Sequence, residues 1–143
     1  MFSKSLFTTL LMLSFGLVFT ACNKDKEPPT LMLTVDQSAA SVGDMISADV
    51  SMEDDRDITN YYIEVVALDL EGQNNLYNFV LKSSDAEPDF EPAKSLDFTN
   101  LEYTVPEVVG SDSLVAGWTL RFYASVQDEN EESVIETVDV TIE

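Results

Sequence analysis

Residues 118–127 read WTLRFYASVQ and alternate between apolar and polar side chains along their whole length. Alternation with a period of two residues indicates a β-strand with one face in a core and the other toward solvent. The buried face would consist of Trp118, Leu120, Phe122, Ala124 and Val126. This strand is the clearest element in the chain, and it predicts an all-β fold.

Six further runs with β-strand character lie before or after this strand in the sequence, and no stretch after residue 30 sustains a helical period. Polar residues, glycine and proline separate the runs, as expected of turns. The alternation slips near Thr99 and Asn100, which predicts a β-bulge there. Seven short strands with this spacing predict a seven-stranded, antiparallel, immunoglobulin-like β-sandwich over residues 31–143. The six further runs are residues 31–35, 46–52, 61–70, 76–81, 96–105 and 134–142.

The N-terminus has the features of a secretory signal peptide. Lys4 supplies a positive charge, and residues 6–19 form an uncharged, almost wholly apolar run of 14 residues. A membrane-spanning helix needs roughly 18 or more apolar residues, so this run fits the apolar part of a signal better. Ordinary cleavage prefers small residues at both positions of an A-x-A pattern, whereas Phe19 and Ala21 precede Cys22 here.

The sequence FTAC, which ends at Cys22, the only cysteine in the chain, resembles the lipobox of bacterial lipoproteins. The resemblance implies a signal peptide over residues 1–21, a diacylglycerol thioether on Cys22 and acylation of its freed amine. Several acyl chains, at about 0.8 kcal/mol per buried methylene, make such attachment effectively permanent. Residues 22–30 would then form a lipidated polar tether. The alternative is an incidental thiol in an ordinary signal peptide or membrane anchor.

Short motifs along the chain extend this resemblance: Cys22 with its tether, residues 41–44 (SVGD), 54–55 (DD), 103–106 (YTVP) and 126–130 (VQDEN). Together they resemble small surface lipoproteins of the Bacteroidota that carry one immunoglobulin-like or cadherin-like domain of unknown function. The resemblance implies the fold and a lipid-anchored position at the bacterial outer membrane, but no particular ligand. Asn23 after the cysteine favours the outer over the inner membrane, and the side that the domain faces stays open. The family usually has a glycine where this chain has Glu131.

The charge and composition exclude several classes of function. The chain has 27 acidic and 7 basic residues, a net charge of −20 and no histidine. Such a surface repels nucleic acid and anionic lipid faces, and it suits cations or basic proteins. Zinc and copper sites are not expected without histidine or a free cysteine, and a serine nucleophile would lack a histidine base. A carboxylate pair could hydrolyse a glycoside, but short loops predict no cleft, so we expect no enzyme.

Acidic residues would gather at one end of the predicted sandwich. The segments 53–57, 83–92 and 128–132 each carry four acids, and Arg56 is the only basic residue among them. Each close pair of carboxylates costs on the order of 1 kcal/mol even at high dielectric, and calcium would relieve this because it binds carboxylate, amide and carbonyl oxygens. The alternative is a set of solvated acidic turns without an ion. The candidate calcium ligands are Asp54, Asp55, Asp57, Asp128 and Asn130.

Tyrosines on two expected strands form a second candidate site. Tyr123 faces outward in the expected register, and Tyr61 or Tyr62 would neighbour it because the third and sixth strands usually pair in this fold. The tyrosines would form a cross-strand pair contributing roughly 0.2–1 kcal/mol. They would alternatively form a flat platform for a sugar ring or a partner protein.

The sequence therefore predicts a lipid-anchored, non-enzymatic protein of the cell envelope. Its immunoglobulin-like module would serve interaction or envelope structure, with an envelope protein or a glycan as partner and calcium as a stabilising ion. The alternative function is a glycan-binding accessory lipoprotein of a surface polysaccharide-uptake system.

Overall fold

The computed structural model describes residues 27–70, 75–110 and 112–143. The predicted signal peptide, Cys22 and most of the tether lie outside these residues. No helix in the described part of the chain is both long and apolar enough to cross a membrane. The described elements are β1 (Thr30–Val35), β2 (Ala39–Ala40), β3 (Met45–Leu68), β4 (Asn75–Ser83), η1 (Ser84–Ala86), β5 (Ala93–Thr104), β6 (Val108–Val109), β7 (Asp112–Ser113), β8 (Thr119–Asp128) and β9 (Ser133–Ile142).

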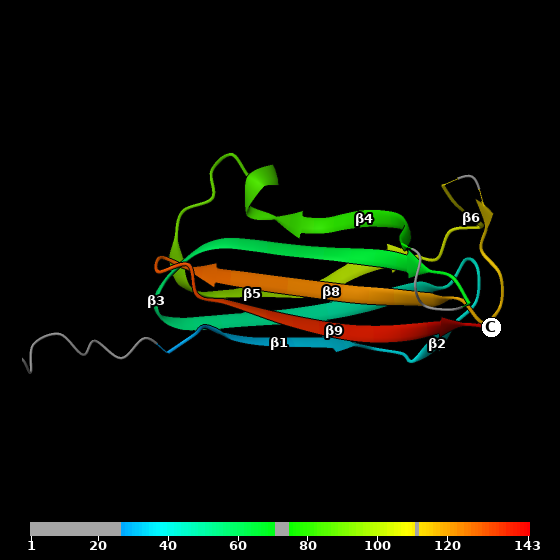
Figure 1. Cartoon of the computed structure of the whole chain (residues 1–143), viewed down its shortest axis with the longest axis horizontal. Helices are drawn as coiled ribbons and strands as arrows, with labels where there is room; N and C mark the ends of the chain where they lie inside the picture. The colour runs from blue at the N-terminus through cyan, green and yellow to red at the C-terminus, as the bar shows by residue number, and fades with distance from the viewer. Residues whose placement is uncertain (1–26, 71–74, 111) are drawn as a thin grey trace, which may run out of the picture.

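The fold is all-β, as the alternating pattern predicts, and its sheet curls into two layers that face each other (Figure 1). The first layer contains β1, the first part of β3 and β5. The second layer contains β4, the second part of β3, β8 and β9. The sheet is mixed and not purely antiparallel, because Ala39 and Ala40 of β2 pair in parallel with Thr141 and Ile142 of β9.

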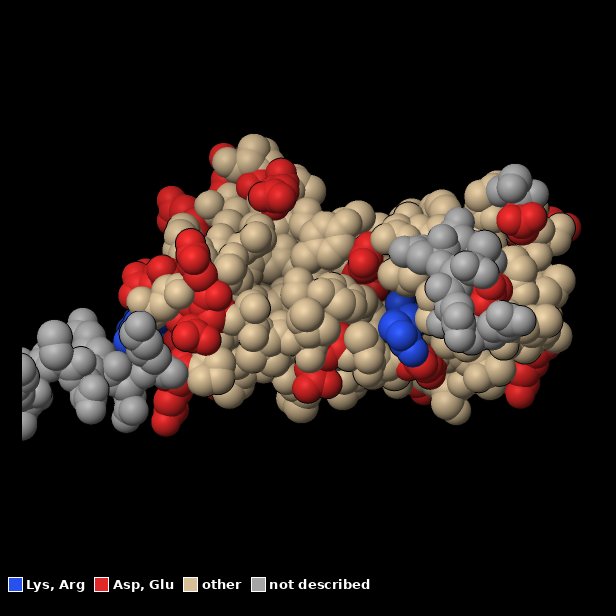
Figure 2. Space-filling model, viewed as in Figure 1, with Lys and Arg blue, Asp and Glu red and all other residues tan. Residues whose placement is uncertain are grey.

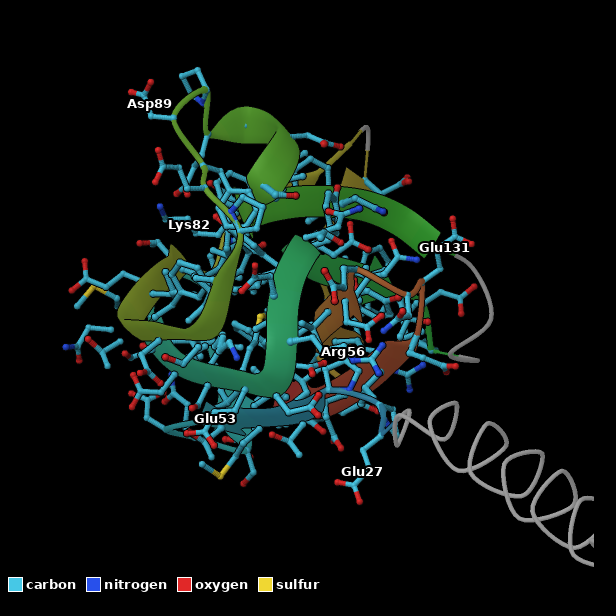
Figure 3. All side chains as sticks on the ribbon, turned by 90° about the vertical axis from the view of Figure 1, so that its left-hand side faces the viewer. Glu27, Glu53, Arg56, Lys82, Asp89 and Glu131 are labelled. Atoms are coloured by element: carbon cyan, nitrogen blue, oxygen red, sulfur yellow. The ribbon has the colours of Figure 1, made fainter. Side chains whose placement is uncertain are left out.

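β3 is one strand of 24 residues, where the sequence predicts two strands separated by an acidic loop at residues 53–57. Its register with β5 breaks between Glu53 and Ile58, and the strand turns there from one layer into the other (Figure 3). Within this bend the Asp54 carboxylate accepts a hydrogen bond of 2.8 Å from the Arg56 N–H. The prediction of a loop is wrong. The Asp54 side chain accepts a hydrogen bond from the backbone N–H of Arg56, which allows the strand to bend without ending.

The core lies between the two layers and follows the predicted alternation. Leu120, Phe122, Ala124 and Val126 of β8 are buried, and the intervening residues are half-buried on the outer face. Burial of each large apolar side chain contributes about 1.5–3 kcal/mol. The inward side chains that meet β8 come from both parts of β3: Ile46, Ala48, Val50, Met52, Ile58, Tyr61, Ile63, Val65 and Ala67.

The bulge predicted near Thr99 and Asn100 is present in β5. The β3–β5 register shifts between Ala48 and Val50, which pair with Leu101 and Phe98. Asn100 adopts a positive φ of 54°, and its N–H donates a hydrogen bond of 2.8 Å to the Asp49 carboxylate. This side-chain hydrogen bond satisfies the extra residue that a bulge leaves unpaired.

The two ends of the body differ. The chain enters at the end where β3 bends and β8 turns into β9, whereas β6, β7 and the C-terminus lie at the opposite end (Figure 1). The first end is rich in acidic side chains (Figure 2). We call it the acidic end, and it consists of the β3 bend at residues 53–57, the connection at 84–92 and the turn at 128–132.

Candidate functional site

The acidic end brings together the three segments that the sequence predicts to meet there. The Glu129 N–H donates a hydrogen bond of 3.1 Å to the Asp57 carbonyl, and Lys94 Nζ donates one of 2.8 Å to the Asp55 carbonyl. Viewed from this end, Arg56 lies among the acidic segments (Figure 3). Arg56 is not the only basic residue here, because Lys82 forms an ion pair with Glu87 and Lys94 reaches the bend.

Asp128 organises the turn between β8 and β9. Although only 2% exposed, its carboxylate accepts hydrogen bonds of 2.8 Å from the N–H groups of Asn130 and Glu132. Its second oxygen accepts a bond of 3.2 Å from the Asn130 amide. Burial alone would raise the pKa of Asp128, but these donors and nearby Arg56 outweigh it and hold the pKa below its usual value. Asp128 therefore acts as the cap of its own turn.

Asp54 is the strained carboxylate of the acidic end. One oxygen accepts a hydrogen bond from the backbone N–H of Arg56, while the other, Oδ2, is buried and accepts none from the described residues. Burial raises the pKa of Asp54, and the neighbouring carboxylates of Asp55 and Asp128 raise it further. Ionisation of Asp54 is thus less favourable in the folded protein than in water.

The five candidate calcium ligands lie at the same end of the body, on the β3 bend and in the Asp128 turn. Within the described part of the chain, however, no group of three or more Asp, Glu, Cys or His side chains is arranged to hold a metal ion. Asp128 and Asn130 are engaged with each other, and Asp57 contacts the turn through its carbonyl. Calcium binding stays a prediction.

Tyr61 does not belong to an exposed tyrosine surface, contrary to the sequence-based expectation. It pairs with inward-facing Val126 and is 1% exposed. Its ring lies 5.2 Å from the ring of Phe90 and 5.0 Å from that of Phe98. The alternation along β3 puts Tyr61 inside and Tyr62 outside, and residues 61–62 alone do not say which tyrosine is buried.

Tyr62 and Tyr123 share the outer face of the second layer. They are diagonal neighbours, because Tyr62 pairs with Ser125 and Tyr123 with Glu64. Burial raises the pKa of Tyr62, and Glu64 raises it further. Both tyrosines line a shallow hollow of about 280 Å³, together with polar residues of β3, β8 and β9: Asn60, Ser125, Gln127 and Ser133. This hollow has the mixture of rings and hydrogen-bonding groups that a sugar or a polar peptide requires.

A second hollow, which the sequence analysis did not identify, lies between β4 and β5. Its volume is about 570 Å³, and its main walls are the rings of Tyr77, Phe79 and Tyr103. Pro106 and Val108 close it toward the C-terminal end of the body. We call it the seam groove. The available sequence signal was the pair of aromatic residues at alternate positions of one strand, Tyr77 and Phe79.

Tyr103 joins the seam groove to the core. Its ring lies 5.5 Å from Phe79 and 6.1 Å from Phe122, both in edge-on geometry. The side chain is 4% exposed, and its hydroxyl is buried without a hydrogen-bond partner in the described chain. Burial raises the pKa of Tyr103 to about 12, with a further contribution from Tyr77. Most buried hydroxyls are hydrogen-bonded, so this one is an exception.

Comparisons with known proteins support the fold and assign no function. No family model matches the chain, and no curated protein is detectably similar to it. Among solved structures, Spo0M, a sporulation control protein from Bacillus subtilis, superposes with a TM-score of 0.53 over 82% of this chain, at 11% sequence identity. This chain spans 50% of the Spo0M chain. At this identity the likeness concerns the fold alone.

Proposed function

We propose that this chain is a lipid-anchored protein of the bacterial outer membrane that serves as a non-enzymatic interaction or structural module. The proposal rests on the different positions of the chain entry and of the seam groove along the body. The chain enters at the acidic end, and β6 lies at the opposite end (Figure 1). Val108 of β6 is one of the residues that line the seam groove. A lipid on Cys22 would thus leave the seam groove directed away from the membrane and open to a partner.

The finer fold is part of this proposal. In this proposal, the layer of β1, the first part of β3 and β5 is one sheet of an immunoglobulin-like sandwich, which the antiparallel pairing of these strands supports. β4, the second part of β3, β8 and β9 correspond to the other. In such domains the loops at the ends of a rigid sandwich carry binding, which suits an envelope interaction module. The motif resemblance to Bacteroidota surface lipoproteins supports the same placement.

The lipid anchor is tested by Cys22→Ala in the full chain, followed by detergent phase partition and mass spectrometry of the mature N-terminus. We expect the wild type in the detergent phase with an acylated Cys22. We expect the variant to accumulate uncleaved or to move into the aqueous phase. An unchanged detergent-phase location of the mature variant, or an unmodified N-terminus in the wild type, would reject the anchor.

A second candidate function is glycan binding as an accessory lipoprotein of a polysaccharide-uptake system. The hollow beside Tyr62 and Tyr123 favours it, because an exposed ring next to amide and hydroxyl groups suits a sugar. A glycan array probed with the full chain in detergent tests this function. Tyr123→Ala should abolish the array signal, whereas Met32→Ala, at an exposed position of β1 that does not line this hollow, should retain it. An array without binding, or a signal that Tyr123→Ala leaves unchanged, excludes this function.

A further inference from the structure

The seam between β4 and β5 is the side of the body where the two layers are not joined by a strand. Among the described elements, β4 pairs only with the second part of β3, and β5 pairs only with the first part. Each strand therefore has one unpaired edge. Because the two strands belong to different layers, their inward faces flank an opening into the core.

One end of this seam is filled by the protein itself. Phe90, in the connection between η1 and β5, packs edge-on against Tyr61 with a centroid separation of 5.2 Å and an interplanar angle of 77°. Tyr61 in turn packs on Phe98 of β5. At the acidic end, Phe90 from a connecting segment thus covers the core between the two layers, together with Lys82 of β4, whose ammonium lies 5.6 Å from the centre of the Phe98 ring.

The other end of the seam has no equivalent of Phe90 in the described residues. Phe79 pairs with Val65, which is 1% exposed and faces inward, yet Phe79 itself is 42% exposed. The Tyr103 side chain lines the same groove, while its hydroxyl is buried and out of reach of an added group. The seam groove therefore presents mainly apolar ring faces.

Beside the seam groove, the edge of β4 lacks the features that protect exposed strand edges. Natural edges are blunted by charged residues or proline, which discourage pairing with another chain. Residues 75–81 (NLYNFVL) contain neither, and the one charged residue of β4, Lys82, lies near its other end in an ion pair with Glu87. β5, in contrast, carries Lys94, Asp97 and Glu102. β4 is thus the edge on which an added strand meets the least opposition.

The charges of the protein indicate which charge a segment bound in the seam groove would carry. Among the described residues that line the seam groove, Glu102 carries the only carboxylate, and it forms no ion pair with the described residues. The chain as a whole carries a net charge of −20, so an acidic partner would be repelled. A lysine or arginine beside the groove would instead be attracted to Glu102.

We propose that the seam groove binds an extended segment of a partner protein, which pairs with the free edge of β4. The segment places an aromatic or large aliphatic side chain against Phe79 and Tyr103 and a basic residue near Glu102. The bound side chain covers the core at this end as Phe90 covers it at the other. Strand addition of this kind takes affinity from main-chain hydrogen bonds and specificity from side-chain pockets.

The probe is a fluorescent peptide about nine residues long, near the upper length of a typical strand. It alternates threonine with apolar residues and has a central phenylalanine flanked by lysines. Fluorescence anisotropy with the full chain in detergent should give saturable binding. Replacement of the central phenylalanine by serine, or N-methylation of alternate peptide nitrogens, should weaken binding by about tenfold, the factor that 1.4 kcal/mol represents.

Protein variants locate the binding. Phe79→Ala and Glu102→Lys should each weaken binding by about tenfold. Met32→Ala, at another exposed apolar strand position, should leave it unchanged. Because Phe79 is substantially exposed, its truncation should preserve the fold, which a thermal melt of each variant checks. Backbone amide shifts confined to β4 would confirm the edge.

Three outcomes would overturn the proposal. They are no saturable binding of any peptide of the panel, binding unaffected by Phe79→Ala and Glu102→Lys, and a concentration-dependent dimer that Phe79→Ala dissolves. The last outcome would assign the groove to a second copy of this chain. This inference rests on the proposed interaction role but not on the lipid anchor. Loss of peptide binding and loss of detergent-phase partition are separate readouts, so either proposal can fail alone.

Discussion

Asp54 accepts a hydrogen bond of 2.8 Å from the backbone N–H of Arg56 through one carboxylate oxygen, while its other oxygen is buried and accepts none within the described part of the chain. This pair forms the bend through which β3 passes from one layer to the other. The hydrogen bond favours the bend, but the unsatisfied oxygen and the nearby carboxylates of Asp55 and Asp128 oppose the charge on Asp54. The bent conformation is therefore electrostatically unfavourable when Asp54 is ionised.

Asp54→Asn should stabilise the protein at neutral pH by about 1 kcal/mol, because it removes a buried charge and keeps the oxygen that accepts the Arg56 N–H. The pKa of Asp54 is raised in the folded state, so its charged form destabilises the fold above that pKa. The gain should shrink as the pH falls through the raised pKa of the folded state, and it should be absent below the ordinary carboxyl pKa, where Asp54 is protonated in both states. Urea unfolding of the full chain at several pH values measures this, with Asp112→Asn, at an exposed position of β7, as the control. A destabilised Asp54→Asn would show that the fold needs the negative charge.

Calcium should raise the thermal midpoint of the full chain relative to EDTA if the acidic end binds it, since a ligand of the folded state stabilises that state. Asp54→Asn should then abolish the shift, and Asp112→Asn on β7 should preserve it. Differential scanning calorimetry in millimolar calcium and in EDTA makes the measurement. Equal midpoints in the two solutions would eliminate the calcium prediction.

Asp128→Ala should lower the free energy of unfolding by about 2 kcal/mol, because three donors of the β8–β9 turn lose an ionised acceptor. Asp128→Asn should lose less, since its amide oxygen can still accept. The pKa of Asp128 is lowered on folding, so its contribution is complete above the ordinary carboxyl pKa and is lost as the pH falls through the folded value. The wild type and Asp128→Ala should therefore converge in strong acid. A difference that persists there would mean that packing, and not charge, underlies the effect.

Glu131→Gly should stabilise the same turn by several tenths of a kcal/mol to about 1 kcal/mol. Glu131 has a φ of 67°, in the left-handed region that side chains disfavour and glycine adopts freely. Part of the gain is offset by the greater backbone entropy of glycine in the unfolded chain. Glu129→Gly, in the same turn without a positive φ, serves as the control and should destabilise. Chemical denaturation compares the two, and equal effects would show that backbone strain at Glu131 is negligible.

The local features of the fold follow from the sequence to a large extent. Alternation in residues 118–127 predicts which side chains of β8 are buried, and the slip near Asn100 predicts the bulge in β5. The acidic segments meet at one end as expected. The sequence did not predict the continuity of β3, because four acids among residues 53–57 are typical of a loop. Asp54 makes the bend possible through one short-range hydrogen bond that composition does not reveal.

By itself the sequence determined the strand character of the chain, its acidic balance and the lipobox-like pattern at Cys22, because each depends on neighbouring residues or on composition. Only the tertiary structure decided that Tyr61 is buried while Tyr62 is half-buried on the outer face, and that Phe79 lies uncovered beside Tyr103. The reason is physical: alternation says which residues of a strand share a face, but not whether another strand covers that face. Coverage depends on residues far away in the chain, and between β4 and β5 the described fold supplies no such strand.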